Sequence, residues 1–397
     1  MTSQTPSRRD RIGDVAEILL DYVEHKTTHQ ARSTTQVRTA TYTDPDQWKA
    51  EMELVFRQLP LMLAFTAEIP NPGDYKAMEV VGLPILINRD KAGTVRAFLN
   101  VCSHRGAPVA AAGHGHCARF TCKYHGWTYG QDGKLIGVSE SALFGEVDRA
   151  SMGLRALPCE ERAGMIFVCL TPNGVMDLDG FFRGFLEDFD AVGLDTWTYL
   201  GSREIEGANW KVAFDGYLEG YHFASLHPET IEPRTPSNRT SYEGFGPSLR
   251  IGFPQHRIAE ALKGVPRADW GDQENNGFDF VRILFPNVSA FLAPEITQIA
   301  QLFPGPTPDK NRTVLNYLRR DPIRDEEDRA NVEAMITFFR DVTYQEDYVI
   351  GMEIQKGLES GAHDHLTFGR NERGNQYFHE WLTWYLEDDR SRPEPTL

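Results

Sequence analysis

The sequence predicts an α+β protein built from a small antiparallel β domain and a larger α+β domain, in which an antiparallel sheet is flanked by helices. The chain has 397 residues and an apolar fraction of 41%, enough for two domains with buried cores. Short β-rich runs occupy its first part, whereas later strand-like runs are followed by amphipathic helical stretches. We therefore expect a helical segment at 1–45 that packs on the larger domain, the β domain at 46–165 and the α+β domain at 166–397.

Two helices are expected near the start of the chain. The first, around residues 10–25, places its apolar side chains on one face. The second, TDPDQWKAEMELVF, has Asp44 at the N-cap position and Pro45 in its first turn. β-Rich runs follow, and the turn signals Asp90–Gly93 and Asp132-Gly133 divide them into hairpins.

The larger domain is expected to combine strands with helices. Residues 209–227 look helical up to Pro228, and the runs FVRILF, ITQIAQLF and TVLNYLR look like strands. The last part of the chain has helical periodicity in three stretches, 325–342, 345–358 and 376–386.

Charge and composition exclude several classes of protein. A formal net charge of −16 argues against binding to nucleic acid, because it repels phosphate backbones. No run of about 18 apolar residues predicts a membrane span, and the N-terminus lacks a signal-peptide core. Five cysteines are too few and too odd in number for a disulfide framework, so a reducing cytoplasm is expected.

A cluster of metal-ligand residues lies in the β domain, as Cys102-x-His104 followed by Cys122-x-x-His125. A structural zinc site is one interpretation, although zinc knuckles usually pair like ligands. Here each loop supplies one Cys and one His, which suits a two-iron cluster with two thiolates on one iron and two imidazoles on the other.

These motifs, CSHRGA and CKYHGWTYG, resemble the Rieske [2Fe–2S] domain of ring-hydroxylating oxygenase α subunits. The resemblance implies that Cys102, His104, Cys122 and His125 hold the cluster. Three further residues between the loops have no place in the motif and are expected to be solvated: His114, His116 and Cys117. The two remaining cysteines, Cys159 and Cys169, are expected to be small core residues.

A second group follows NWK, as Glu219-x-x-His222-x4-His227. A regular helix would point the two histidines apart, so they converge on one metal only if the helix deforms or ends between them, and Pro228 suits an ending. The segment resembles the catalytic-domain motif of the same family. That resemblance implies that His222 and His227 bind a mononuclear Fe²⁺ in a 2-His-1-carboxylate site.

The resemblance also assigns roles to carboxylates. The family places the third iron ligand about eight residues before a Gln, and Asp347 has that spacing to Gln355. Two other acids, Asp341 and Glu346, compete with it, and an ordinary solvated charge is the alternative for all three. Glu219 is implied to bridge a cluster histidine of one subunit and an iron-ligand histidine of the next, which makes it the electron-transfer residue. The role of Asp215 is left open.

The expected function is that of a terminal oxygenase component with a [2Fe–2S] cluster and Fe²⁺, which adds oxygen from O₂ to a small organic substrate. Electrons are expected from a separate NAD(P)H-dependent reductase, with or without a ferredoxin, because the chain shows no nucleotide-binding G-x-G-x-x-G. Aromatic dihydroxylation is the expected reaction. Monooxygenation or oxidative demethylation of a non-aromatic or an N- or O-methylated substrate is the alternative, and a simple Rieske electron carrier is a third. The family implies a homotrimer, with or without β subunits.

Overall fold

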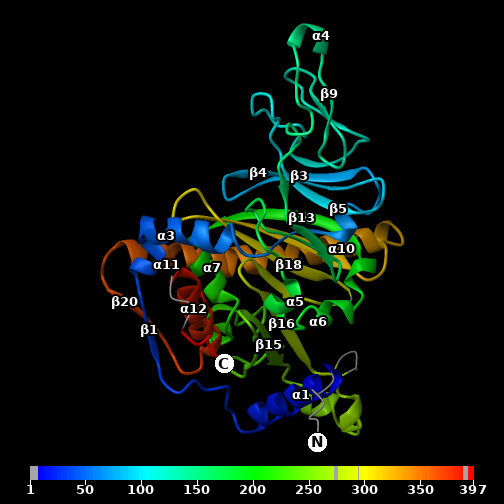
Figure 1. Ribbon diagram of the computed structural model, residues 1–397. Helices are drawn as coiled ribbons and strands as arrows, with labels where there is room; N and C mark the ends of the chain where they lie inside the picture. Colours follow the sequence, from blue (N-terminus) through cyan, green and yellow to red (C-terminus); the bar gives the residue numbers. More distant parts are fainter. Residues whose placement is uncertain (1–7, 272–275, 294, 388–391) are drawn as a thin grey trace, which may run out of the picture. The chain divides into compact units, whose positions relative to one another are not determined.

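The computed structural model describes residues 8–271, 276–293, 295–387 and 392–397. The chain is divided into two compact units. The smaller unit comprises Met52–Leu178 and Phe189–Tyr199, and the larger unit comprises Met1–Glu51, Asp179–Asp188 and Leu200–Leu397. The mixed helix and sheet content confirms the predicted α+β class (Figure 1).

The smaller unit is built from three antiparallel sheets, of five, three and three strands in the orders β10-β5-β4-β3-β6, β11-β12-β2 and β7-β8-β9. Both predicted hairpin turns are present. The backbone N–H of Asp90 donates to Thr94, and that of Gly130 donates to Lys134. The strands are β2 (Leu61–Phe65), β3 (Asp74–Val80), β4 (Leu83–Arg89), β5 (Val95–Leu99), β6 (Gly113–His116), β7 (Phe120–Thr121), β8 (Thr128–Tyr129), β9 (Leu135–Gly137), β10 (Ala156–Leu157), β11 (Cys159–Arg162) and β12 (Met165–Val168).

The larger unit is organised around a seven-stranded antiparallel sheet in the order β13-β19-β18-β17-β16-β15-β14. The predicted runs FVRILF, ITQIAQLF and TVLNYLR lie in β16, β18 and β19. A two-stranded sheet, β1-β20, lies elsewhere in the unit. The strands are β1 (Thr35–Arg38), β13 (Thr198–Gly207), β14 (Ser241–Phe245), β15 (Ser248–Pro254), β16 (Phe278–Leu284), β17 (Val288–Phe291), β18 (Thr297–Pro304), β19 (Asn311–Arg319) and β20 (His365–Phe368).

Helices pack on the large sheet from several parts of the chain. Helix α1 (Arg8–Glu24) contacts β15, and helix α7 (Trp210–Gly216) contacts β18 and β19. A hydrogen bond of 3.1 Å joins Gln298 of β18 to Thr343, and an ion pair of 3.0 Å joins Arg319 of β19 to Asp328. The α-helices are α1 (Arg8–Glu24), α2 (Ala40–Thr43), α3 (Pro45–Glu51), α4 (Ser141–Phe144), α5 (Leu178–Phe182), α6 (Glu187–Asp190), α7 (Trp210–Gly216), α8 (Phe223–Leu226), α9 (Ile258–Ala261), α10 (Glu326–Asp341), α11 (Val349–Glu359) and α12 (Arg373–Leu386).

Two predicted helices differ from the observed ones. The expected continuous helix over 209–227 is wrong, because the chain forms α7, leaves the helix through a turn that contains Gly220, and enters the short α8. The predicted helix over 345–358 begins as the last part of a π-helix, Val342–Tyr348, before it continues as α11. Both irregular segments carry predicted iron ligands: His222 and His227 flank α8, and Asp347 lies in the π-helix.

A buried ion pair joins α3 to α7 within the larger unit. Lys211 of α7 and Glu51 of α3 are 1% and 0% exposed, and the Lys211 ammonium lies 2.6 Å from both carboxylate oxygens. Trp210 also donates its indole N–H to Glu51 at 2.8 Å. The pair therefore fixes the start of α7, whose end leads into the second group of candidate ligands.

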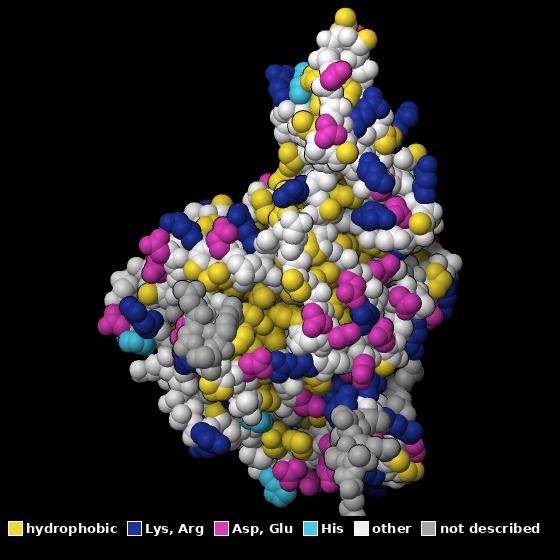
Figure 2. Space-filling view, viewed as in Figure 1, with side chains coloured by type: hydrophobic (Ala, Val, Ile, Leu, Met, Phe, Trp, Pro, Cys, Tyr) yellow, Lys and Arg dark blue, Asp and Glu magenta, His cyan; other side chains and the backbone are white. Residues whose placement is uncertain are grey.

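The chain leaves the larger unit after Glu51 and returns to it after Leu178, and the segment Phe189–Tyr199 belongs again to the smaller unit. Charge is distributed unevenly on the visible face in Figure 2: Lys and Arg side chains gather on the smaller unit, and acidic side chains lie beside an apolar area on the larger unit. In the described part of the chain, no helix has the length and apolar character needed to cross a bilayer.

Candidate metal centres

Two loops of the smaller unit have the same backbone geometry, and each carries one Cys and one His. In the first, Gly106 N–H donates to the carbonyl of Cys102 at 2.9 Å. In the second, Gly126 N–H donates to the carbonyl of Cys122 at 3.0 Å. Both glycines have positive φ, 78° and 70°, which a residue without a Cβ adopts at little cost. The matched turns explain why each motif has a glycine four residues after its cysteine.

The four predicted cluster ligands lie on these two loops with the cysteines inside and the histidines outside. Cys102 and Cys122 are 3% and 2% exposed, and the rings of His104 and His125 lie 4.7 Å apart. The buried ring of Trp127 stacks on His104 at 5.0 Å. This arrangement suits a cluster whose thiolate iron is buried and whose imidazole iron is nearer the surface.

The hydroxyl of Tyr129 contacts the base of the first loop. It lies 3.2 Å from Cys102 Sγ and accepts the backbone N–H of Ser103 at 2.9 Å. Burial is the main cause that raises the pKa of Tyr129, to about 12, so the phenol stays protonated and can donate toward the sulfur. Sequence reasoning missed this residue, although it lies within the quoted motif CKYHGWTYG.

A single zinc ion does not fit the four residues. Among the described residues, only one group of three or more His, Cys, Asp or Glu brings its ligand atoms within 4.8 Å of one another, and it contains none of these four. One tetrahedral ion would need all four donors that close. Two pairs of donors that bind two separate irons would not need all four donors to lie that close together. The donor set therefore fits a two-iron cluster.

The other cysteines and histidines of the smaller unit have ordinary surroundings. Exposed His114 lies 2.9 Å from Glu68, and exposed His116 lies 2.9 Å from Asp74. Burial raises the pKa of the Cys159 thiol, to about 12, and also raises that of Cys169. Both thiols therefore remain protonated and unreactive. Cys169 is a buried core residue as expected, whereas Cys159 is only partly buried.

In the larger unit, the two ends of the short α8 and the π-helix Val342–Tyr348 bring His222, His227 and Asp347 together. His222 precedes the first residue of α8 and His227 follows its last. Nε2 of His227 lies 2.9 Å from Asp347 Oδ1, and Nε2 of His222 lies 3.7 Å from the same atom. These are the residues whose ligand atoms lie within 4.8 Å of one another. Two imidazoles and one carboxylate form the donor set that non-heme Fe²⁺ prefers.

Both histidines are held through their other ring nitrogen. Nδ1 of His222 contacts a carboxylate oxygen of Glu219, and Nδ1 of His227 contacts Glu346. The Glu219 carboxylate also accepts the backbone N–H of Tyr221. Metal-bound histidines usually donate their second N–H to a carboxylate in this way, so both rings present Nε2 to the site.

The electrostatics of His227 agree with this arrangement. Burial acts to lower the pKa of His227, but the hydrogen bonds and charges of Asp347 and Glu346 outweigh burial and raise it above its ordinary value. The two carboxylates therefore favour positive charge at the His227 ring, which is compatible with a bound cation.

Of the three competing acids, only Asp347 contacts the Nε2 atoms. Asp341 instead pairs with the guanidinium of Arg340 at 2.5 Å, and Glu346 lies on the Nδ1 side of His227. The buried Gln355 is used elsewhere: its side-chain oxygen accepts the backbone N–H of Asn209 at 3.2 Å. The eight-residue spacing thus separates Asp347, which lies at the site, from Gln355, which supports the start of α7.

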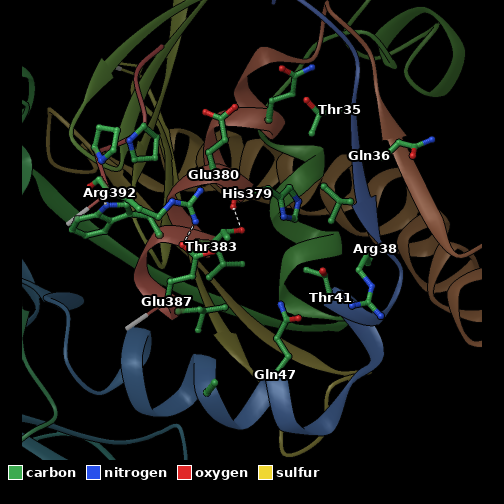
Figure 3. Close-up of a pocket in the computed structure, with 18 residues that line it drawn as sticks. Thr35, Gln36, Arg38, Thr41, Gln47, His379, Glu380, Thr383, Glu387 and Arg392 are labelled. Atoms are coloured by element: carbon green, nitrogen blue, oxygen red, sulfur yellow. Dashed lines mark hydrogen bonds and ion pairs between the residues drawn. The ribbon is translucent and has the colours of Figure 1, made fainter. Parts of the chain in front are cut away.

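Asp215, whose role was open, belongs to a separate buried network. Its carboxylate accepts from Tyr42 at 2.7 Å, contacts His379 Nε2 at 3.0 Å, and accepts from Asn375 at 3.3 Å. His379 also lines a cavity of about 660 Å³ between β1 and α12 (Figure 3). None of the candidate metal ligands lines that cavity. The hydrogen bonds of Asp215 to His379 and Asn375 join α7 to α12, so packing between these two helices explains this residue.

Two family models match the chain, one to each unit in turn. The Rieske [2Fe-2S] domain matches residues 60–144, and the ring hydroxylating alpha subunit (catalytic domain) matches residues 194–388. Together these domains imply a Rieske cluster and a mononuclear iron, as the donor sets described above allow.

Curated relatives include both monooxygenases and dioxygenases. The glycine betaine monooxygenase oxygenase subunit of Chromohalobacter salexigens is 31% identical over 56% of this chain and 51% of its own length. The anthranilate 1,2-dioxygenase large subunit of Acinetobacter baylyi is 30% identical over 47% of this chain and 41% of its own length. The carnitine monooxygenase oxygenase subunit of Escherichia coli is 28% identical over 87% of this chain and 92% of its own length. This chain thus matches about half of the first two relatives and nearly all of the third.

Solved structures share the fold. The quaternary ammonium Rieske monooxygenase CntA has a TM-score of 0.77 at 22% identity, covering 89% of this chain and 95% of that one. Naphthalene 1,2-dioxygenase from Rhodococcus has a TM-score of 0.71 at 19% identity, covering 94% and 99%. With both domains matched in sequence and the fold matched over most of its length, this chain belongs to the large, or alpha, subunits of the Rieske oxygenases.

Proposed function

We propose that this chain is the oxygenase component of a monooxygenase that oxidises a quaternary ammonium compound. The convergence of His222, His227 and Asp347 is the observation that carries the assignment as an oxygenase. The comparison with carnitine monooxygenase supports the substrate class, because that relative matches along 92% of its length, whereas the anthranilate dioxygenase match covers 41%. This choice favours the alternative named from the sequence over aromatic dihydroxylation.

Aromatic side chains beside the histidines suit such a substrate. The ring of Phe223 lies 4.9 Å from His222 and 6.0 Å from His227, and Phe253 lies 5.5 Å from Phe223. Aromatic faces attract alkylammonium cations, and the overall acidic charge of the chain favours their approach. The same rings would also accept an aromatic substrate, so they are compatible with both substrate classes.

Each group of residues has a distinct proposed task. Cys102, His104, Cys122 and His125 hold the cluster, and His222, His227 and Asp347 hold the mononuclear iron. When bound, these groups supply single-electron transfer and activation of O₂. Glu219 orients His222 and provides the route for an electron from the cluster of a neighbouring subunit, which requires an oligomer such as a homotrimer. A separate reductase, with or without a ferredoxin, supplies the electrons.

A substrate panel in ¹⁸O₂ tests the proposal. Purified protein, a reductase and NADH are incubated with carnitine, γ-butyrobetaine and glycine betaine in one set, and with benzoate and anthranilate in the other. We expect hydroxylation next to the ammonium nitrogen, then cleavage of the C–N bond to release an amine and leave a carbonyl product, with about one O₂ consumed per amine. A cis-diol carrying both labelled atoms, formed from an aromatic acid, would support dihydroxylation instead.

The electron-carrier alternative makes a different prediction. A protein that only carries electrons does not need a convergent 2-His-1-carboxylate group in a second unit. This chain has such a group, and its two histidines flank the short α8. Loaded carrier protein would reduce an acceptor at full rate but would consume no O₂ with any compound of either set.

A further inference from the structure

Glu346 and Asp347 are consecutive residues that contact opposite nitrogens of the same imidazole. Glu346 lies 2.5 Å from Nδ1 of His227, and Asp347 lies 2.9 Å from its Nε2. The His227 side chain is only 1% exposed, so its ring is fixed between the two acids. The pair therefore determines both the orientation of the ring and which nitrogen faces the metal site.

The local backbone explains how neighbouring acids reach two sides of one ring. Successive residues of a helix point in different directions, so two consecutive carboxylates straddle a ring more easily than they meet at one atom. Both acids lie in the π-helix Val342–Tyr348, a rare conformation that is frequently found at functional sites. The extra methylene of Glu346 lets it reach the far nitrogen.

The Glu346 carboxylate is itself held in place. The hydroxyl of Thr230 donates to the same oxygen, Oε2, at 2.8 Å. Thr230 lies three residues after His227, so a short segment supplies both the ring and the group that orients its acceptor. With two donors on one oxygen, the carboxylate has a defined position even though its side chain is 26% exposed.

We propose that Glu346 is a positioning residue of the mononuclear site rather than a ligand or a solvated charge. By accepting the N–H of His227 Nδ1, it fixes the tautomer in which Nε2 carries the lone pair. That lone pair then faces the same point as His222 Nε2 and Asp347 Oδ1. The inference rests on the proposed iron site, but it does not depend on the substrate.

Metal binding tests this role without turnover. Protein that retains its cluster but is depleted of the mononuclear metal is titrated with Co²⁺, whose visible ligand-field absorption reports the donor geometry. We expect Glu346→Ala to weaken Co²⁺ binding by roughly 10–100-fold and to change that absorption, since carboxylates that orient ligand histidines have effects of this size. Glu346→Gln keeps an acceptor for the Nδ1 N–H and should fall between Glu346→Ala and the wild-type protein.

Two controls separate positioning from general stability. Glu353→Gln removes an exposed acid from α11 that pairs with Lys356 at 2.6 Å, and it should bind Co²⁺ as the wild-type protein does. The visible spectrum of the cluster should be unchanged in every variant. If Glu346→Ala does not retain the cluster, Glu346→Gln replaces it in the comparison, and its affinity and absorption must still differ from wild type.

Wild-type affinity together with an unchanged Co²⁺ spectrum in Glu346→Ala, or in Glu346→Gln where that variant stands in, would overturn the proposal. A parallel titration of His222→Ala distinguishes this failure from a wrong metal site. If His222→Ala also bound Co²⁺ normally, the site itself would be misassigned. If only His222→Ala lost binding, the site would stand and Glu346 would have no positioning role.

Discussion

Gly106 and Gly126 occupy equivalent positions in two separate loops, each four residues after a cysteine and each with positive φ. Their N–H groups close the same type of turn on Cys102 and Cys122. The two glycines therefore give both loops the same turn, although the histidine stands two residues after Cys102 and three residues after Cys122.

Alanine at these two glycines should have unequal effects. A Cβ at Gly126 would lie 3.3 Å from Ser139, whereas one at Gly106 would meet no atom within 4 Å. Both substitutions carry the cost of left-handed backbone, about 1–2 kcal/mol. We expect Gly126→Ala to lower the free energy of unfolding more than Gly106→Ala, measured by denaturant titration followed through the cluster absorption. Equal losses would show that the contact with Ser139 has no effect.

Glu219 should affect electron transfer more than metal content. Because its carboxylate contacts His222 Nδ1, Glu219→Gln removes the charge but keeps an oxygen that can accept that N–H. We expect both metals to remain, while reoxidation of the reduced cluster by O₂ and substrate slows by roughly 10–100-fold in stopped-flow absorption. Glu229→Gln, at an exposed residue of the same segment, is the matched control. Cluster reoxidation at the wild-type rate in Glu219→Gln would refute the bridging role.

The buried Asp188 should make stability depend on acid pH. It contacts Arg8, Arg250 and Arg282, each at 2.9 Å. Burial acts to raise its pKa, but these three charges outweigh burial and lower it to about 2. A carboxyl whose folded pKa is depressed stabilises the protein above its unfolded pKa, near 4, and this stabilisation is lost as the pH falls toward the folded value.

The test is the difference in free energy of unfolding between wild type and Asp188→Asn. We expect that difference to be about 2 kcal/mol or more at pH 7, from the pKa shift alone, and to shrink between pH 4 and pH 2. Asp46→Asn, at an exposed aspartate of α3, should change stability little at either pH. A difference for Asp188→Asn that stays constant down to pH 2 would contradict the depressed pKa.

Sequence patterns predicted the α+β class and the two hairpin turns, because both depend on local features such as alternation and Asp-Gly turns. They did not predict the interruption between α7 and α8. Apolar spacing over 209–227 favours one helix, and the turn that includes Gly220 is stabilised by tertiary contacts such as the hydrogen bond from Asn238 N–H to its carbonyl. That break precedes both histidines. His222 and His227 converge because α8 is only four residues long and ends before His227, whose backbone is no longer helical.

The place of Glu346 could not be derived from spacing either. Periodicity treats Asp341, Glu346 and Asp347 as alternative acids on one helix, whereas the π-helix turns two of them toward His227 at once. Resemblance to a family selected Asp347 but carried no information on its neighbour. The two acids are distinguished only by which nitrogen each one contacts.

The most direct test of the account is an iron and acid-labile sulfide analysis of the wild-type protein beside His222→Ala. We predict about three irons and two sulfides per chain in the wild type, and about two irons and two sulfides in His222→Ala, with the visible spectrum of the cluster unchanged. Two irons in fully loaded wild-type protein, or loss of the cluster together with the third iron in His222→Ala, would contradict the presence of two independent iron centres on this chain.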